Sequence, residues 1–266
     1  MANEPGADAP APYDNWADLY DKVYAYLDYD LEFWVAQAQE ADGPILEMGC
    51  GTGRVAIVLA ELGFDVTGVD ISPRMIEQAN AKLTSKDLAS KARFIVGDMA
   101  EEDPGANADF GLVIFPFRSF QSMLTPEEQR DALANAATHL RVGGLLALDL
   151  FSPDMEQLGD RRDEAVPFHV RDIDQPDGST IVVWGQNLWD NVSQVNSARL
   201  IIEEVSPSGL MTARHYRDFD LRYTFRYEME HLLELSGFTV EHVYGDFEHG
   251  EVTEQTDDLV LVARKT

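Results

Sequence analysis

The sequence is poor in the residues and runs that cross-link a protein or anchor it in a membrane. Its single cysteine, Cys50, excludes an internal disulfide framework and a cysteine-based zinc site. No apolar run approaches the ~18 residues that a membrane helix needs. Residues 1–12 are small, polar and proline-rich, without the apolar segment of a signal peptide. We therefore expect a cytoplasmic protein that begins with a disordered tail and has no metal site.

Positive charge is also scarce. The 266 residues include 20 basic and 48 acidic side chains, which leaves a formal net charge of −28. A surface this acidic repels phosphate groups, which argues against DNA, RNA or an anionic membrane as a partner. Only five of the basic residues are lysines, and none lies between Lys91 and Lys265. This composition favours a halophilic protein from a salt-rich cytoplasm, and an acidic mesophilic enzyme is the plainer alternative.

What the sequence does have is a cluster of glycines after an apolar strand. Residues 45–53 read Ile-Leu-Glu-Met-Gly-Cys-Gly-Thr-Gly, and residues 65–70 read Asp-Val-Thr-Gly-Val-Asp. Glycine lets the backbone approach a ligand without a Cβ in between, and an acid at the end of the next strand can accept both hydroxyls of a ribose. The two segments therefore predict a nucleotide-like ligand between Gly49 and Asp70.

The pattern Glu-x-Gly-x-Gly-x-Gly resembles motif I of class I S-adenosylmethionine (SAM)-dependent methyltransferases, and it differs from the Gly-x-Gly-x-x-Gly of nicotinamide-dependent enzymes. Residues 68–75, Gly-Val-Asp-Ile-Ser-Pro-Arg-Met, resemble the second motif of the same family, and residues 97–99, Gly-Asp-Met, resemble its adenine motif. In organisation the chain is similar to small-molecule N-methyltransferases that act on glycine-type amines or amino sugars. The resemblance implies SAM as the cofactor.

Strand and helix patterns alternate along most of the chain, after a helical pattern at residues 13–40. The first five strand patterns lie near 44–48, 65–70, 92–96, 110–115 and 144–150, with helix patterns near 53–62, 73–83 and 126–140. The last patterns are a helix near 225–236 and strands near 238–245 and 257–264. The short connections between them predict an α/β fold with a Rossmann-like, seven-stranded, mostly parallel sheet. Residues 151–222 instead hold alternating stretches separated by turn signals, which predict an antiparallel, β-rich insertion after strand five. We expect residues 13–150 and 223–266 to form the SAM-binding methyltransferase domain. The insertion would form a lid over the acceptor site.

The resemblance also implies roles for residues at the carboxyl ends of the strands. Asp70 would accept the ribose hydroxyls, Asp98 would accept from the adenine amine, and Glu47 would meet the ammonium group of the cofactor. The full set of expected cofactor-binding residues is Tyr13, Glu47, Gly49, Cys50, Gly51, Gly53, Arg54, Asp70, Ile71, Met75, Asp98, Met99 and Phe115. Two of these have plainer alternatives, because Arg54 could be a solvated residue in a first helical turn and Cys50 could serve packing.

Methyl transfer to a heteroatom is an in-line displacement, so alignment and desolvation supply much of the catalysis. The candidate catalytic residues are Tyr20 in the first helical pattern, Arg118 after strand four and His215 in the insertion. Residues 115–118 lack the Asn-Pro-Pro-Tyr pattern of enzymes that methylate amide or nucleobase nitrogens. We expect a small-molecule acceptor, with an amine nitrogen ahead of a hydroxyl, and a monomer or homodimer. The alternatives are a nicotinamide-dependent oxidoreductase and a non-catalytic SAM-binding partner subunit.

Overall fold

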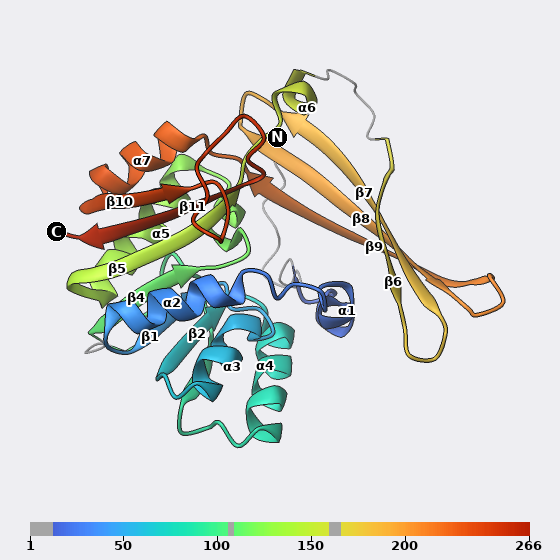
Figure 1. Ribbon diagram of the computed structural model, residues 1–266, viewed down its shortest axis with the longest axis horizontal. Coiled ribbons are helices and arrows are strands. Elements are labelled where there is room, and N and C mark those ends of the chain that lie inside the picture. Colours follow the sequence, from blue (N-terminus) through green and yellow to red (C-terminus); the bar gives the residue numbers. More distant parts are fainter. Residues whose placement is uncertain (1–12, 106–108, 160–165) are drawn as a thin grey trace.

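The larger of two sheets in the protein has seven strands. The computed structural model describes residues 13–105, 109–159 and 166–266 (Figure 1), so the predicted tail lies outside the described residues. The strand order is β10-β11-β5-β4-β1-β2-β3. The strands are β1 (Ile45–Met48), β2 (Val66–Asp70), β3 (Ala92–Val96), β4 (Phe110–Phe115), β5 (Leu140–Phe151), β10 (Phe238–Tyr244) and β11 (Asp258–Lys265). Strands β1 to β5 pair in parallel, and β11 runs antiparallel to β5 and β10, which confirms the predicted fold class.

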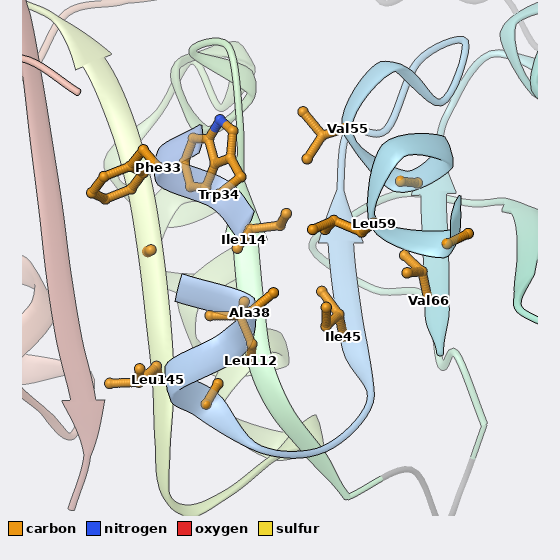
Figure 2. Close-up of a cluster of buried hydrophobic side chains, with 14 of the residues drawn as sticks. Phe33, Trp34, Ala38, Ile45, Val55, Leu59, Val66, Leu112, Ile114 and Leu145 are labelled. Carbon is orange, nitrogen blue, oxygen red and sulfur yellow. The ribbon is translucent and has the colours of Figure 1, made fainter. Parts of the chain in front are cut away.

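Helices cover both faces of this sheet. They are α2 (Leu31–Ala41), α3 (Arg54–Glu61), α4 (Pro73–Ser85), α5 (Pro126–His139) and α7 (Arg226–Leu235). On one face, Phe33 and Trp34 of α2 and Leu59 of α3 pack in a cluster with residues of β1, β4 and β5 (Figure 2). On the other face, Leu133 of α5 and Met229 of α7 close a second cluster. Two covered faces explain why most residues of the inner strands are apolar and buried.

Local capping fixes where the predicted helices begin. The Ser72 hydroxyl accepts a hydrogen bond from the amide of Met75 at 3.2 Å, which caps α4 just before Pro73. Thr125 and Glu128 form a reciprocal capping box at the start of α5. Within the described part of the chain, no helix has both the length and the apolar character needed to cross a membrane.

The continuous helical pattern expected over residues 13–40 is wrong as a single helix. The structure has α1 (Ala17–Val23) and then α2, separated by a connection at residues 24–30. Tyrosine and aspartate dominate this connection, and both have lower helix propensity than the residues on either side. The Asp30 carboxylate accepts from Trp34 Nε1 at 3.0 Å and from Arg54 at 2.6 Å instead of capping α2.

The second sheet lies between β5 and α7 in the sequence. It has four antiparallel strands, β6 (Phe168–Asp174), β7 (Thr180–Asp190), β8 (Val195–Val205) and β9 (Met211–Arg222), and a short helix, α6 (Met155–Gly159), precedes it. Figure 1 shows these strands extending away from the larger sheet, with α1 below them. Trp16, Leu19 and Val23 pack with Val183 and Ile202 of this sheet. The N-terminal helix is therefore the apolar support of the inserted sheet.

Candidate active site

The turn between β1 and α3 has three glycines in the left-handed conformation. Gly49, Gly51 and Gly53 have φ angles of 71°, 53° and 79°, which cost other residues free energy. A Cβ on Gly49 would lie 2.6 Å from the Cβ of Ser119. A Cβ on Gly51 would meet no protein atom within 4 Å, and Gly51 lines a cavity. Glycine at this position therefore leaves open the space that a ligand would fill.

Asp70 ends β2 directly opposite this turn. Its Oδ2 accepts from the Gly51 amide at 2.8 Å, and its Oδ1 accepts from the Ser72 amide at 2.9 Å. Each carboxylate oxygen has a second lone pair, so both can still accept from hydroxyl donors. Burial raises the pKa of Asp70, and the two amide hydrogen bonds act in the opposite direction.

Two adjoining cavities lie beside Asp70. They share Tyr13, Asp70, Ile71, Met99, Ser122 and Phe219. The Asp98 cavity is completed by Val69, Gly97, Asp98, Met123, Leu124, Asp218 and Asp220. The glycine-turn cavity is completed by Trp16, Tyr20, Tyr24, Gly49, Gly51, Met75, Pro116, Phe117, Arg118, Ser119 and Leu221. Because the walls are shared, one elongated ligand can extend through both cavities.

One side of the glycine-turn cavity is built from packed rings, which we call the aromatic wall: Trp16, Tyr20, Tyr24, Phe117 and Phe219. The ring centroids of Tyr20 and Tyr24 are 4.8 Å apart, and those of Tyr24 and Phe117 are 5.0 Å apart with the rings edge to face. Burial raises the pKa of both tyrosines well above the usual value, so their phenols stay neutral. The wall offers ring faces and hydroxyl groups without a fixed charge.

Glu47 of β1 lies behind the glycine turn and lines neither cavity. Its side chain is buried, and its Oε2 has no hydrogen-bond partner within the described chain. Burial raises the pKa of Glu47 to about 8, although the nearby Arg54 guanidinium acts to lower it. A cation arriving in this region would favour the ionised carboxylate.

Most of the residues predicted from the sequence do meet at these two cavities. The predicted residues that line them are Tyr13, Tyr20, Gly49, Gly51, Asp70, Ile71, Met75, Asp98, Met99 and Arg118. Asp98 follows β3, and its Oδ1 already accepts from the Ala100 amide at 2.8 Å. The guanidinium of Arg118 is 2.7 Å from Asp258.

Two predicted residues have partners elsewhere in the fold, and these partners argue against the roles expected for them. Arg54 is not free for a carboxylate of the cofactor, because its guanidinium binds Asp30 at 2.6 and 2.7 Å and the Leu27 carbonyl at 3.1 Å. His215 lines neither cavity, and its Nε2 lies 3.1 Å from Glu204 on the neighbouring strand. The structure therefore gives Arg54 and His215 partners outside the two cavities.

Three more predicted residues support the site from behind the cavity walls. Cys50 is buried, and its Sγ would lie 2.8 Å from a Cβ on Gly68 of β2, so it serves packing. Phe115 is buried against Phe120 with ring centroids 5.5 Å apart. A Cβ on Gly53 would lie 2.9 Å from the Phe94 ring, so any other residue at this position would have to displace that ring.

Sequence reasoning missed several lining residues. Tyr24 follows Tyr20 by four positions, a spacing that places both on one face of a helix. Phe219 and Leu221 alternate along β9 and share a face, as strand geometry requires. Phe117 and Ser119 lie in the segment after strand four that also holds the predicted Arg118, but which of its side chains line the cavity depends on an irregular turn after β4.

The comparisons with known proteins agree with this geometry. Residues 45–144, which include the glycine turn, Asp70 and Asp98, match a family model described as a methyltransferase domain. Putative methyltransferase YqeM of Bacillus subtilis (strain 168) is 25% identical over 269 aligned positions, which cover 96% of this chain and 97% of that protein. The glycine/sarcosine N-methyltransferase of Aphanothece halophytica is 26% identical, over 95% of this chain and 87% of that one. Shorter matches include O-methyltransferases.

A solved structure has the same fold over nearly the whole chain. The CcbJ methyltransferase from Streptomyces caelestis is similar with a TM-score of 0.73 and 25% identity, and the likeness covers 99% of this chain and 94% of that one. It therefore includes the four-stranded sheet as well as the larger one. These findings support a SAM-dependent methyltransferase over the nicotinamide-dependent oxidoreductase.

Proposed function

Since the chain is a SAM-dependent methyltransferase, we propose that it methylates an amine nitrogen of a small molecule. The observation that carries this proposal is the aromatic wall. Neutral rings such as Tyr20, Tyr24 and Phe117 bind a cationic amine through their faces, and the attraction grows as water is excluded. The wall borders the glycine-turn cavity, into which the methyl group of the cofactor would point.

The cofactor would occupy both cavities. Asp70 lies where they join and has acceptor capacity for both ribose hydroxyls. Asp98 and Met99 would receive the adenine in the Asp98 cavity. The methionine end would lie over Gly51, where a Cβ would fill the space, and beside Tyr13. Glu47 would balance the ammonium group directly or through water, because one of its buried oxygens has no other partner in the described chain.

The ionisable groups of the walls favour nitrogen over oxygen as the acceptor. Bound SAM supplies a methyl group that its sulfonium already activates, so the residues of the chain need only bind, orient and exclude water. A hydroxyl acceptor needs a strong base at its oxygen, and the described walls of both cavities contain neither histidine nor lysine. An amine can bind to the ring faces as a cation and then lose its proton to water before the methyl group is transferred, so it needs no base from the walls. The relationship to a glycine/sarcosine N-methyltransferase supports the same choice.

A matched acceptor screen tests the proposal. Purified protein would be incubated with SAM labelled in its methyl group and with pairs that differ only in nitrogen or oxygen, such as glycine with glycolate and an amino sugar with its parent sugar. We expect label in at least one amine and none in its hydroxyl partner. The Asp70→Ala variant controls for non-enzymatic transfer. Label in the hydroxyl partners alone would overturn the choice of nitrogen.

A further inference from the structure

The turn after β4 is strained at the edge of the glycine-turn cavity. Phe117 and Arg118 have φ angles of 53° and 63°, so two consecutive residues with side chains adopt the left-handed conformation. This conformation costs a residue with a Cβ roughly 1–2 kcal/mol. Both residues line the cavity. The surrounding structure must therefore supply contacts that hold the turn in this form.

Three strand ends hold the turn. The Arg118 amide donates to the Asp149 carboxylate of β5 at 3.1 Å. The Ser119 hydroxyl donates to the Met48 carbonyl at the end of β1 at 2.9 Å. The Arg118 guanidinium donates to Asp258 of β11 at 2.7 Å. Only the first of these contacts reaches the backbone of a left-handed residue.

Asp149 is an unusual residue for its position. It is 2% exposed in the middle of the larger sheet, and its Oδ1 has no hydrogen-bond partner within the described residues. A buried carboxylate with an unsatisfied oxygen costs free energy that an apolar side chain would avoid. Asp149 also lines neither cavity, so it does not touch a ligand there.

We propose that Asp149 is the positioning residue of the acceptor site: its carboxylate holds the backbone of Phe117 and Arg118 so that their side chains face the acceptor. The proposal rests on the proposed function, because it takes the glycine-turn cavity as the acceptor site. Without the carboxylate, the turn would relax toward right-handed or extended backbone. The Phe117 ring would then leave its edge-to-face contact with Tyr24 at 5.0 Å, which opens the aromatic wall.

The charge around Asp149 makes the hold sensitive to pH near neutrality. Burial raises the pKa of Asp149 to about 7; the Arg118 guanidinium and the Phe117 amide lower it, and the charges of Asp258 and Asp30 raise it. An amide donates a stronger hydrogen bond to a carboxylate than to a carboxylic acid. The turn is therefore held more firmly above pH 7 than below it.

Hydrogen exchange of the turn tests the proposal without any acceptor. Amide exchange of residues 117–121 would be measured in the wild type, in Asp149→Ala and Asp149→Asn, and in Glu228→Gln as the matched control. Glu228 also binds an arginine, Arg222 at 3.1 Å, and accepts a backbone amide at 3.4 Å, but it lies on α7. We expect exchange of the turn to rise at least tenfold in Asp149→Ala, less in Asp149→Asn, and not at all in the control. Calorimetry should give SAM affinities within threefold of the wild type for all three variants.

A second measurement covers the case in which Asp149→Ala does not fold. In the wild type, the protection of the turn relative to β11 should increase as the pH rises from 6 to 8, after correction for intrinsic exchange. Turn exchange equal to the wild type in both Asp149 variants, or relative protection that does not change with pH, would overturn the proposal. Neither result depends on which atom is methylated, so a failed amine screen leaves this test intact. With an acceptor in hand, Asp149→Asn should lower kcat/KM while SAM affinity is kept.

Discussion

The central strands β1, β2 and β4 of the seven-stranded sheet are buried almost along their whole length, whereas the strands of the four-stranded sheet alternate between less and more exposed residues. All six residues of β4 are buried. Along β9, half-buried and exposed positions alternate as far as its buried last residue, Arg222. The larger sheet has helices on both faces, but the smaller sheet packs one face on α1 and presents the other to solvent. The two sheets therefore differ in how strictly their sequences are constrained.

The two sheets also contribute differently to the site. The larger sheet brings its ligand-facing groups from consecutive strand ends, with Gly51 after β1, Asp70 at the end of β2 and Asp98 after β3. The smaller sheet contributes one strand, β9, whose Phe219 and Leu221 line the glycine-turn cavity and whose Asp218, Phe219 and Asp220 line the Asp98 cavity. A cofactor site at the carboxyl ends of adjacent parallel strands is a property of the fold and recurs wherever the fold occurs. An acceptor site completed by an inserted sheet can change from protein to protein while the cofactor site stays the same.

The helix α1 couples the two regions. Its apolar side packs on the smaller sheet, and its acidic side is tied to the larger domain. Asp14, just before the helix, accepts from the Ser72 hydroxyl at 2.6 Å, Asp18 pairs with Arg74 at 3.0 Å, and Asp21 pairs with Lys82 at 2.7 Å. The tyrosines of the aromatic wall come from the same segment. The order of the acceptor side therefore depends on both regions.

The largest expected effect is on SAM affinity, and it should differ between two acids that line the same Asp98 cavity, Asp70 of the larger sheet and Asp220 of the smaller one. We expect Asp70→Ala to weaken SAM binding by about ten- to a hundredfold, because a charged hydrogen bond contributes ~1.5–3 kcal/mol. Asp220→Asn, on β9, should weaken it by less than about threefold, because an exposed acid of this kind contributes little. Titration calorimetry with SAM measures both. Equal losses of SAM affinity in the two variants would contradict the conclusion that the larger sheet supplies most of the cofactor binding.

The next effect concerns the acceptor side. Phe219 of β9 packs against Trp16 and Tyr13 with ring centroids 5.9 and 6.5 Å apart. Such ring pairs contribute about 0.5–1.5 kcal/mol each, so Phe219→Ala should raise the KM for the acceptor found in the amine screen by about tenfold. SAM affinity should change by less than about threefold. Tyr216→Ala, on the outer face of the same strand, is the matched control.

The Phe219→Ala variant tests the acceptor site with little change to the fold. Removal of residues 151–222 would not, because it would also destabilise the fold. Without the inserted sheet, Trp16, Leu19 and Val23 of the N-terminal segment would lose their apolar partners. An acceptor KM unchanged by Phe219→Ala would remove β9 from the acceptor site and leave the smaller sheet as support for α1.

A smaller expected effect is the pH dependence of the free energy of unfolding, to which the two sheets contribute with opposite sign. Burial raises the pKa of Glu47 to about 8 and that of Asp149 to about 7, both in the larger sheet. A carboxyl whose pKa is raised by folding contributes stability at acid pH that is lost as the pH rises through the folded value. The free energy of unfolding should therefore fall by roughly 1–3 kcal/mol between pH 5 and pH 8. Exposed Asp218 of β9 has its pKa lowered by Arg199, so it acts in the opposite direction.

Denaturant unfolding at several pH values measures this slope. Glu47→Gln should flatten it, while Asp218→Asn should leave it nearly unchanged. A slope that the Glu47 substitution does not alter would mean that Glu47 ionises at its ordinary pKa despite its burial. The same acid range that strengthens the fold should weaken the hold of Asp149 on the acceptor turn, so stability and turn protection are expected to change in opposite directions.

The elements of the larger sheet could be predicted to within a few residues because each has a local cause. Its central strands β1, β2 and β4 are short buried runs, and two of its helices begin at the caps Ser72 and Thr125. The break between α1 and α2 was missed because the aromatic spacing continues through residues 24–27 although the backbone does not. The spacing of aromatic residues predicts which side chains share a face. It does not predict where the backbone leaves the helix, as it does in the connection that ends at Asp30.

The site divides in the same way. Asp70, Gly51 and Asp98 could be predicted because each belongs to a short motif next to a strand end. Arg54 and His215 could not be placed, because their partners Asp30 and Glu204 are distant in sequence and are brought near only by packing and strand register. The aromatic wall as a whole could not be predicted either, because its residues come from three separate segments: the N-terminal segment, the turn after β4 and strand β9. A charged residue beside a motif is thus weaker information than the motif itself.

The smallest expected effect is on salt, and it acts on both sheets at once. With 48 acidic and 20 basic residues, most of the repulsion is between acids that have no basic partner to neutralise them. Raising KCl from dilute to 1 M shortens the Debye length to ~3 Å and suppresses this repulsion. Salt also weakens exposed ion pairs such as Arg74–Asp18 and Lys91–Asp65, but each contributes at most about 1 kcal/mol. The excess of 28 negative charges should prevail, so we expect Tm to rise by about 2–6 °C.

Two comparisons make the salt prediction sharper. Tetramethylammonium chloride at equal ionic strength should give a similar rise in Tm if screening is the cause, and a smaller one if potassium binds specifically. Amide protection should increase more in β6–β9 than in β1–β5, because exposed acids such as Asp174, Asp190 and Asp220 lie on a sheet with one open face. A Tm that is constant or falls from dilute to molar KCl would remove the argument for a salt-adapted protein. Equal gains in protection would show that the charge acts on the whole fold, and that the open sheet is no weaker than the covered one.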